Sequence, residues 1–170
     1  VYLRGVAVEL IPTTLLAMVD AAIGGKTGVN FAGYKNMVGT FYPAAEVQIY
    51  PGTLKTLPRR EYRSGLAEVI KTALLGDEGL LELLESRHDE VLRREPEVVH
   101  ELIGRAVAVK VEVVRRDLRE GGRRAILNLG HTFGHALESA TAFRSYSHGE
   151  AVAWGVGRAL VLGLQLGMTD

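Results

Sequence analysis

The sequence predicts a mainly α protein in which a few short strands precede an all-helical body. Short β-branched runs bounded by proline or glycine lie within the first 52 residues. From Thr53 onward, apolar residues recur at the three- and four-residue spacing of helices, and glycine pairs or Gly-Asp steps separate segments of helical length. We therefore divide the chain into residues 1–52 and residues 53–170.

The first region begins with a predicted strand over residues 6–11, which Pro12 ends. Thr13 and Thr14 follow and can cap a short run over residues 15–19, which Asp20 closes. Residues 24–39 form a predicted polar loop whose glycines and lysines can approach a ligand closely. A second strand is predicted over residues 47–50, before Pro51-Gly52.

The helical body contains five predicted helices. The first covers residues 61–75 and starts near Pro58, and the second and third cover residues 78–92 and 97 to about 118. The last two cover residues 125–140 and 149–166. Because these two are rich in small and apolar residues, we expect them to be buried.

Composition excludes several classes of function. The 170 residues are 47% hydrophobic and 24% charged with a net charge of +0, so we expect neither a nucleic acid nor a membrane partner. The absence of cysteine excludes disulfides and thiolate zinc sites, and with no signal pattern we expect a cytoplasmic protein. Because the chain opens on a strand-like run without methionine and stops just after a helical run, we expect a fragment of a longer protein.

Histidines and one glutamate form a candidate metal site. His131 and His135 are one helical turn apart, His148 precedes the last predicted helix, and Glu68 lies on the first. Two imidazoles and one carboxylate suit a catalytic zinc with an open position. Spacing alone first pairs His131 with His135, but Thr132 replaces the glutamate of the His-Glu-x-x-His motif. Histidines that only pack or cap helices remain an equal alternative.

Cationic residues within apolar or glycine-rich segments suggest an anionic ligand. A buried ammonium needs an anionic partner, and a phosphate or carboxylate substrate would supply one. The alternative is that their long stems reach the surface. The residues concerned are Lys26, Lys35, Lys71, Lys110, Arg123 and Arg124.

Two nucleotide motifs are excluded, and three polar residues remain as candidates. Gly25-Lys26-Thr27 ends like a phosphate-binding loop, but Asp20 stands where its first glycine belongs. No Gly-x-Gly-x-x-Gly fingerprint is present, so the residues alone do not indicate NAD. Asp20, Asn36 and Asn128 lie beside apolar runs, where Asn128 either caps a helix or orients a substrate hydroxyl.

Seven sequence blocks resemble the 3-dehydroquinate synthase family, in the family's order. They are Pro-Thr-Thr-Leu-Leu-Ala-Met-Val-Asp at 12–20, Gly-Gly-Lys-Thr-Gly-Val-Asn at 24–30, Lys-Asn-Met-Val-Gly at 35–39, Leu-Lys-Thr-Leu-Pro at 54–58, Gly-Leu-Ala-Glu-Val-Ile-Lys at 65–71, Arg-Ala-Ile-Leu-Asn-Leu-Gly-His-Thr-Phe-Gly-His-Ala at 124–136 and His-Gly-Glu at 148–150. The resemblance implies that residues 1–52 are the C-terminal edge of a Rossmann-like α/β NAD-binding domain. It implies that residues 53–170 are an all-helical metal-binding domain.

The resemblance also implies roles for individual residues. It makes Glu68, His131 and His148 the ligands of Zn²⁺ (or Co²⁺) and leaves His135 to the substrate. The implied substrate pocket is Asp20, Lys26, Asn36, Lys71, Lys110, Arg124, Asn128 and His135. The residues implied to line NAD are Thr13, Thr14, Lys26, Lys35, Thr53, Leu54, Lys55 and Thr56.

The reaction implied by the resemblance converts 3-deoxy-D-arabino-heptulosonate 7-phosphate, a phosphorylated sugar acid, to 3-dehydroquinate and phosphate. It combines transient oxidation by NAD, phosphate elimination, reduction and an intramolecular aldol closure, and it belongs to the shikimate pathway. The family is usually homodimeric. Alternatives are another sugar-phosphate cyclase, such as one acting on sedoheptulose 7-phosphate, a metal-dependent alcohol dehydrogenase, or a non-catalytic helical fragment.

Overall fold

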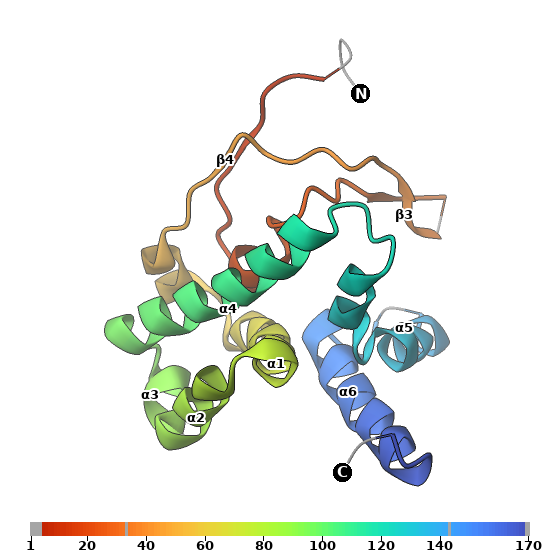
Figure 1. Cartoon of the computed structure of the whole chain (residues 1–170). Helices are drawn as coiled ribbons and strands as arrows, with labels where there is room; N and C mark the ends of the chain where they lie inside the picture. Colours follow the sequence, from red (N-terminus) through yellow and green to blue (C-terminus); the bar gives the residue numbers. More distant parts are fainter. Residues whose placement is uncertain (1–4, 33, 143, 169–170) are drawn as a thin grey trace.

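Short strands and turns precede a helical body, so the predicted mainly α class is confirmed. The computed structural model describes residues 5–32, 34–142 and 144–168. In Figure 1 the N-terminal region passes over one side of the long helix α4 (Pro96–Arg116), and α1, α2 and α3 lie on its opposite side. None of the helices within the described ranges is both long and apolar enough to cross a membrane.

Two short parallel strands are present: one lies within the strand predicted over residues 6–11, and the other overlaps the strand predicted over residues 47–50 only at Val47. β1 (Glu9–Leu10) pairs with β4 (Glu46–Val47), with Leu10 beside Val47. Backbone hydrogen bonds extend this pairing beyond the strands, from Ala45 N to Val8 O and from Gln48 N to Leu10 O. Both strands are shorter than predicted, because only a few residues of each segment have a partner.

Part of the predicted loop over residues 24–39 is a β-ribbon, so the prediction was wrong for residues 29–31 and 34–38. β2 (Val29–Phe31) pairs antiparallel with β3 (Tyr34–Val38). The polar and glycine residues suggested a loop, but the intervening valines and aromatic residues favour extended backbone. The ribbon exposes Phe31 and Met37.

One short helical turn follows β1, and another connects β4 to the helical body. The predicted cap at Thr14 is confirmed, since Thr14 Oγ1 accepts a hydrogen bond of 3.1 Å from Ala17 N before η2 (Ala17–Ala21). η3 (Pro51–Thr56) then leads to Pro58, which stands at the N-terminal boundary of α1 (Arg59–Gly76), so the predicted helix start there is confirmed.

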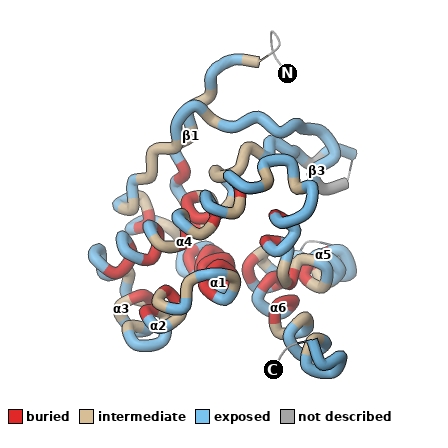
Figure 2. Tube along the Cα trace, in the orientation of Figure 1, coloured by how far each residue is buried: buried red, intermediate tan, exposed pale blue. Residues whose placement is uncertain are grey.

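The core lies between α1, α2 (Glu78–Ser86), α3 (His88–Arg93) and α4, with η2 against it. Figure 2 shows buried residues concentrated on α1 and on the faces turned toward it. The single helix predicted over residues 78–92 was wrong, because the chain turns at Arg87. That turn brings Val91 beneath Tyr62, whose hydroxyl donates to Val91 O over 2.9 Å. Buried members of the core include Leu15, Met18, Val69, Leu80, Val98, Leu102 and Ala106.

The helix predicted over residues 125–140 is also divided, so that prediction was wrong. η4 (Arg123–Asn128) ends before Gly130, which has a φ of 78°, and α5 (His131–Ala140) begins after it. A Cβ on Gly130 would lie 2.6 Å from Val156 N, so the close approach to the next helix requires glycine here. The break sets His131 at the start of a helix.

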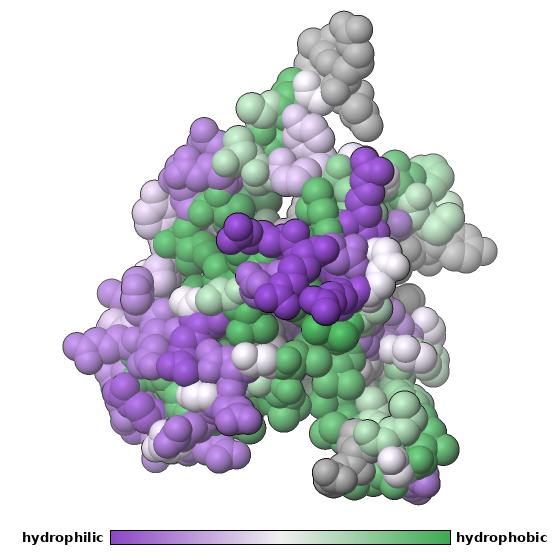
Figure 3. Space-filling model, viewed as in Figure 1, coloured by the Kyte–Doolittle hydropathy of each residue, from purple (hydrophilic) through white to green (hydrophobic). Residues whose placement is uncertain are grey.

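The last helix, α6 (His148–Gln165), begins with a capping box made by Ser147 and Glu150. The expected burial holds only for one face of its first half, which packs on α1 and α5 with Ala151, Val152 and Val156 buried and Trp154 exposed, and in α5 only Gly134 and Glu138 are buried. The expectation of burial was wrong for the second half of α6, which exposes Leu160, Val161 and Leu164. Figure 3 shows apolar residues gathered at this C-terminal end.

Candidate metal centre and anion site

Glu68 occupies the centre of the candidate site. It lies in the middle of α1 with 0% of its surface exposed, and neither carboxylate oxygen has a well-aligned hydrogen bond. Lys71, one turn further along the same helix, places Nζ 2.5 Å from Oε2 as a charge contact. A buried carboxylate with oxygens that lack aligned donors is suited to a cation.

His131 approaches Glu68 from the start of α5. Its Nε2 lies 3.8 Å from Glu68 Oε1, and its Nδ1 lies 3.3 Å from Leu129 O. The carbonyl can only accept, so it favours a proton on Nδ1 and leaves the Nε2 lone pair turned toward Glu68.

His148 approaches Glu68 from the start of α6. Its Nε2 lies 3.5 Å from Glu68 Oε1. The position of His148 depends on its neighbour Gly149, whose N–H donates to Ser64 Oγ over 2.9 Å. A Cβ on Gly149 would lie 2.1 Å from Ser64 O. A glycine is therefore required for α6 to approach α1 closely enough to bring His148 to Glu68.

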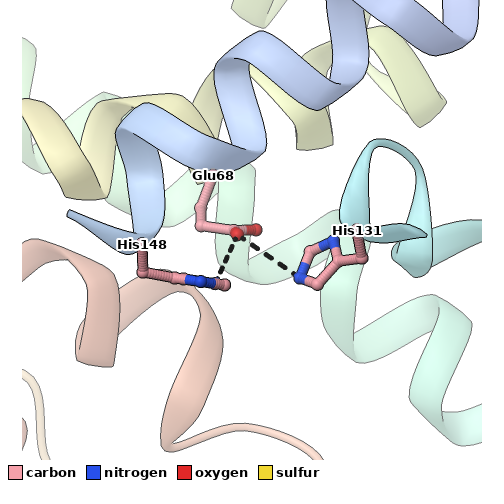
Figure 4. A group of neighbouring side chains, drawn as sticks. All are labelled: Glu68, His131 and His148. Carbon is pink, nitrogen blue, oxygen red and sulfur yellow. Dashed lines mark ion pairs between the residues drawn. The ribbon is translucent and has the colours of Figure 1, made fainter. Parts of the chain in front are cut away.

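The three side chains point toward one another from three helices (Figure 4). Zn–N and Zn–O distances of about 2.0–2.1 Å place two ligands of a tetrahedral ion about 3.4 Å apart. The Glu68–His148 and Glu68–His131 distances of 3.5 Å and 3.8 Å are close to this value. The donors therefore fit one divalent ion, with small movements and an open fourth position.

The electrostatics of the site favour the protonation states that bind metal. Burial raises the pKa of Glu68, but contact with His148 and the charge of Lys71 outweigh it and lower the pKa to about 2. Burial, and then the charge of Lys71, lower the pKa of His131. A charged carboxylate and a neutral imidazole are the forms that coordinate a metal.

His135 belongs to a different group from His131. His135 Nε2 lies 3.9 Å from Glu138 Oε2, and Glu138 Oε1 lies 3.3 Å from His148 Nδ1. Within the described residues, His131 groups with Glu68 and His148, so the pairing of His131 with His135 suggested by spacing is not the one that the fold favours. No sequence motif marks Glu138, although it lies seven residues after His131 on the same helix.

A lysine and an aspartate selected from the sequence meet between η2 and α4. Lys110 Nζ donates to Asp20 O over 2.6 Å and also contacts Asp20 Oδ1. Burial lowers the pKa of Lys110, and the Asp20 carboxylate opposes this effect. The charges of Lys71 and Glu68 also act on Lys110, so this pair lies within electrostatic range of the candidate metal site.

A second group joins Lys26 to Asn128. Both contact Glu120, Lys26 Nζ at 2.6 Å from Oε2 and Asn128 Nδ2 at 2.9 Å from Oε1. The sequence allowed Asn128 to cap a helix, but in the structure it is the last residue of η4 and caps no helix. Glu120 was not among the predicted site residues, because it lies in the loop after α4 and has no helical spacing to indicate it.

Arg124 is buried, with 2% of its surface exposed, and its guanidinium donates to Gly24 O and Leu118 O. A Cβ on Gly24 would lie 2.3 Å from Arg124 Nη2, so Gly24 makes room for the guanidinium. Asn36 is exposed on β3 with a φ of 57°. The side chain of Lys35 lies outside the described residues.

The two segments predicted to line a cofactor lie together. Thr53 Oγ1 is 3.4 Å from Thr13 O and donates to Tyr50 O over 2.9 Å. Lys55 and Thr56 are exposed, whereas the side chain of Leu54 is buried in the core. The fold thus brings together the 13–14 and 53–56 segments, and their role toward a cofactor stays a prediction.

Comparison with known structures identifies relatives of the same architecture. Over 98% of this chain and 47% of the other, the structure superposes on 2-epi-5-epi-valiolone synthase from Streptomyces hygroscopicus subsp. jinggangensis 5008, solved with NAD⁺ and Zn²⁺, with a TM-score of 0.90 and 40% identity. A 2-deoxy-scyllo-inosose synthase, solved with carbaglucose-6-phosphate, NAD⁺ and Co²⁺, superposes with a TM-score of 0.83 and 29% identity, over 96% of this chain and 44% of that one.

Comparison with curated sequences gives relatives of higher identity than these solved structures. The chain is 54% identical to 3-dehydroquinate synthase of Acidithiobacillus ferrooxidans over 98% of its length, and 50% identical to that of Solibacter usitatus. It spans about half the length of these relatives, 46% and 47%. Residues 1–64 match the family model for the N-terminal part of 3-dehydroquinate synthase, and residues 65–170 match the model for its C-terminal part. The chain therefore belongs to the 3-dehydroquinate synthase family.

Proposed function

We propose that this chain is part of a 3-dehydroquinate synthase, a lyase of the shikimate pathway. Its substrate would be 3-deoxy-D-arabino-heptulosonate 7-phosphate, and its products 3-dehydroquinate and phosphate. The observation that carries the proposal is the convergence of Glu68, His131 and His148, next to buried cations, in a chain of this family.

The proposed metal ligands are Glu68, His131 and His148, and the metal is Zn²⁺ or Co²⁺, as in the solved relatives. The proposed NAD contacts come from the 13–14 and 53–56 segments together with Lys26 and Lys35. When bound, the metal would polarise a substrate oxygen, and NAD would accept and return a hydride.

The protein's own contribution is to bind and orient the substrate. Lys71, Lys110 and Arg124 would hold its phosphate and carboxylate, and His135, whose side chain is partly exposed, would contact it. These cations already have anionic or carbonyl partners, such as Glu68 for Lys71 and Asp20 for Lys110. The positive charges are therefore held in position before substrate arrives, which lowers the cost of reorganisation during the reaction. Lys26, Asn36 and Asn128 complete the proposed pocket.

The proposed domain division places residues 1–52 in the NAD-binding domain and residues 53–170 in the helical domain. The two family models meet at residues 64–65, inside α1, slightly later than this boundary. We further propose a homodimer working in the cytoplasm, as the family resemblance implies.

The decisive experiment measures bound metal. After equilibration with Zn²⁺ and dialysis, elemental analysis should find roughly one ion per chain, and His131→Ala should lose most of it because one of three ligands is removed. His100→Ala is the matched control, since His100 is exposed on α4. A wild-type protein without metal, or a His131→Ala variant that retains it, would contradict the proposal.

A second candidate function is another sugar-phosphate cyclase, because the structure superposes closely on a 2-epi-5-epi-valiolone synthase. Product analysis with the full-length protein separates the two. Release of phosphate with 3-dehydroquinate supports our proposal, whereas cyclisation of sedoheptulose 7-phosphate supports the second. Net accumulation of NADH would instead indicate a dehydrogenase.

A further inference from the structure

A buried acid lies behind the candidate metal site. Glu138 is on α5 with 5% of its surface exposed. His131, His135 and Glu138 follow one another at intervals of four and three residues, so they line one face of this helix. Burial makes an ionised carboxylate costly unless neighbouring groups stabilise its charge. The position of Glu138 therefore calls for partners, and two imidazoles are within reach.

The imidazole of His148 lies between two carboxylates. Glu138 Oε1 is 3.3 Å from His148 Nδ1, and Glu68 Oε1 is 3.5 Å from His148 Nε2. The other oxygen of Glu138, Oε2, is 3.9 Å from His135 Nε2. Glu138 thus contacts the ring of a proposed metal ligand at the nitrogen that faces away from Glu68.

A histidine can coordinate a metal through Nε2 only if that nitrogen carries a lone pair. In a neutral imidazole the single proton must then reside on Nδ1, where it needs an acceptor. For His131 the Leu129 carbonyl supplies this acceptor at 3.3 Å. For His148 the equivalent group is the Glu138 carboxylate, which also makes the ring a stronger ligand.

We propose that Glu138 is a positioning residue that orients His148 and holds its proton on Nδ1, so that Nε2 faces the metal. The proposal rests on the proposed metal site formed by Glu68, His131 and His148. It assigns Glu138 no contact with substrate or metal.

An alternative is that His135, Glu138 and His148 bind a second metal ion, since their ligand atoms also lie close together. That arrangement would require His148 to bind one ion through each nitrogen, and therefore to lose both ring protons. The side chain of His135 is 46% exposed, which also makes this set more open than the first. We therefore favour a positioning role, and the number of bound ions distinguishes the two.

The test compares zinc affinity in Glu138→Met and Glu138→Gln. Methionine keeps the length of the side chain but provides no comparable acceptor, whereas glutamine keeps an acceptor oxygen and loses the charge. We expect Glu138→Met to weaken zinc binding by about 10- to 100-fold, measured by competition with a chelator, and Glu138→Gln to retain more affinity than Glu138→Met. Glu85→Ala, at an exposed position of α2, should bind zinc like the wild type.

A second measurement reports on the proton directly. In the zinc-loaded wild type, nitrogen NMR should find the His148 proton on Nδ1 and protected from exchange, and Glu138→Met should remove that protection. Wild-type affinity and protection in Glu138→Met would overturn the inference while leaving the metal site intact. Two ions in the wild type and one in Glu138→Met would overturn it in favour of a second metal site. A wild type that binds no zinc would overturn the proposed function and this inference with it.

Discussion

Gly149→Ala tests whether the close packing of α6 on α1 creates the metal site. A Cβ at position 149 would lie 2.1 Å from Ser64 O and 2.4 Å from Ser64 Cα, and these are backbone atoms that cannot rotate away. Relieving the contact to an ordinary 3.4 Å requires a separation of about 1.3 Å between the two helices at this point. The hydrogen bond from Gly149 N to Ser64 Oγ would be lost at the same time.

The consequence for the site follows from its neighbour in the chain. His148 Nε2 is 3.5 Å from Glu68 Oε1, so the same movement would increase this distance to as much as about 4.8 Å. Ligands of one zinc ion are about 3.4 Å apart, and the variant should therefore lose most of its metal affinity. Overpacking of this kind also costs about 1–3 kcal/mol of unfolding free energy.

Two assays measure these effects, with a control on the same helix. Chelator competition gives the zinc affinity, and urea unfolding of the metal-free protein gives the stability. Gly157→Ala is the matched variant, since a Cβ there meets no atom within 4 Å and alanine favours helix. Wild-type affinity and stability in Gly149→Ala would refute the argument that helix packing sets the ligand geometry.

Two further predictions concern charged pairs. Lys71→Met removes the ammonium 2.5 Å from the buried Glu68 carboxylate. The metal-free protein should therefore lose about 3–5 kcal/mol of unfolding free energy, and the pKa of Glu68 should rise above about 2. Urea unfolding with a chelator present measures the loss, and an unchanged unfolding midpoint would contradict the prediction. Asp77→Ala removes the N-cap of α2 and the partner of Arg105, at a cost of about 1–2 kcal/mol near neutral pH. Because the hydrogen bond from Arg105 lowers the pKa of Asp77 below its usual 3.8, the contribution of the ionised carboxylate is present above pH 3.8 and is lost as the pH falls through the lowered pKa. The difference in unfolding free energy between Asp77→Ala and the wild type should therefore shrink in acid to the part of the N-cap that a protonated carboxyl still makes, and a difference that does not change with pH would count against the ion pair.

The helical body could be predicted from the sequence because its signals are local. The amphipathic spacing of α1 and α4, the proline at the start of each, and the Gly76-Asp77 break are readable without any distant contact. The predictions that were wrong depend on distant contacts. Val91 beneath Tyr62 ends one predicted helix early, and Gly130 against α6 divides another.

For the candidate site, the sequence by itself determined which side chains were available: one glutamate, three histidines and a set of lysines and arginines in apolar segments. Helical spacing alone favoured a metal site that pairs His131 with His135, because spacing relates only residues of the same helix. The tertiary structure decided that Glu68 faces His131 and His148, since Gly149 lets α6 approach α1 and the break at Gly130 turns α5 toward both. The tertiary structure also revealed Glu138 and Glu120. No motif marks these two residues, and their partners are close to them only in space. A chain can encode donor atoms residue by residue, but their distances arise only when separate helices pack.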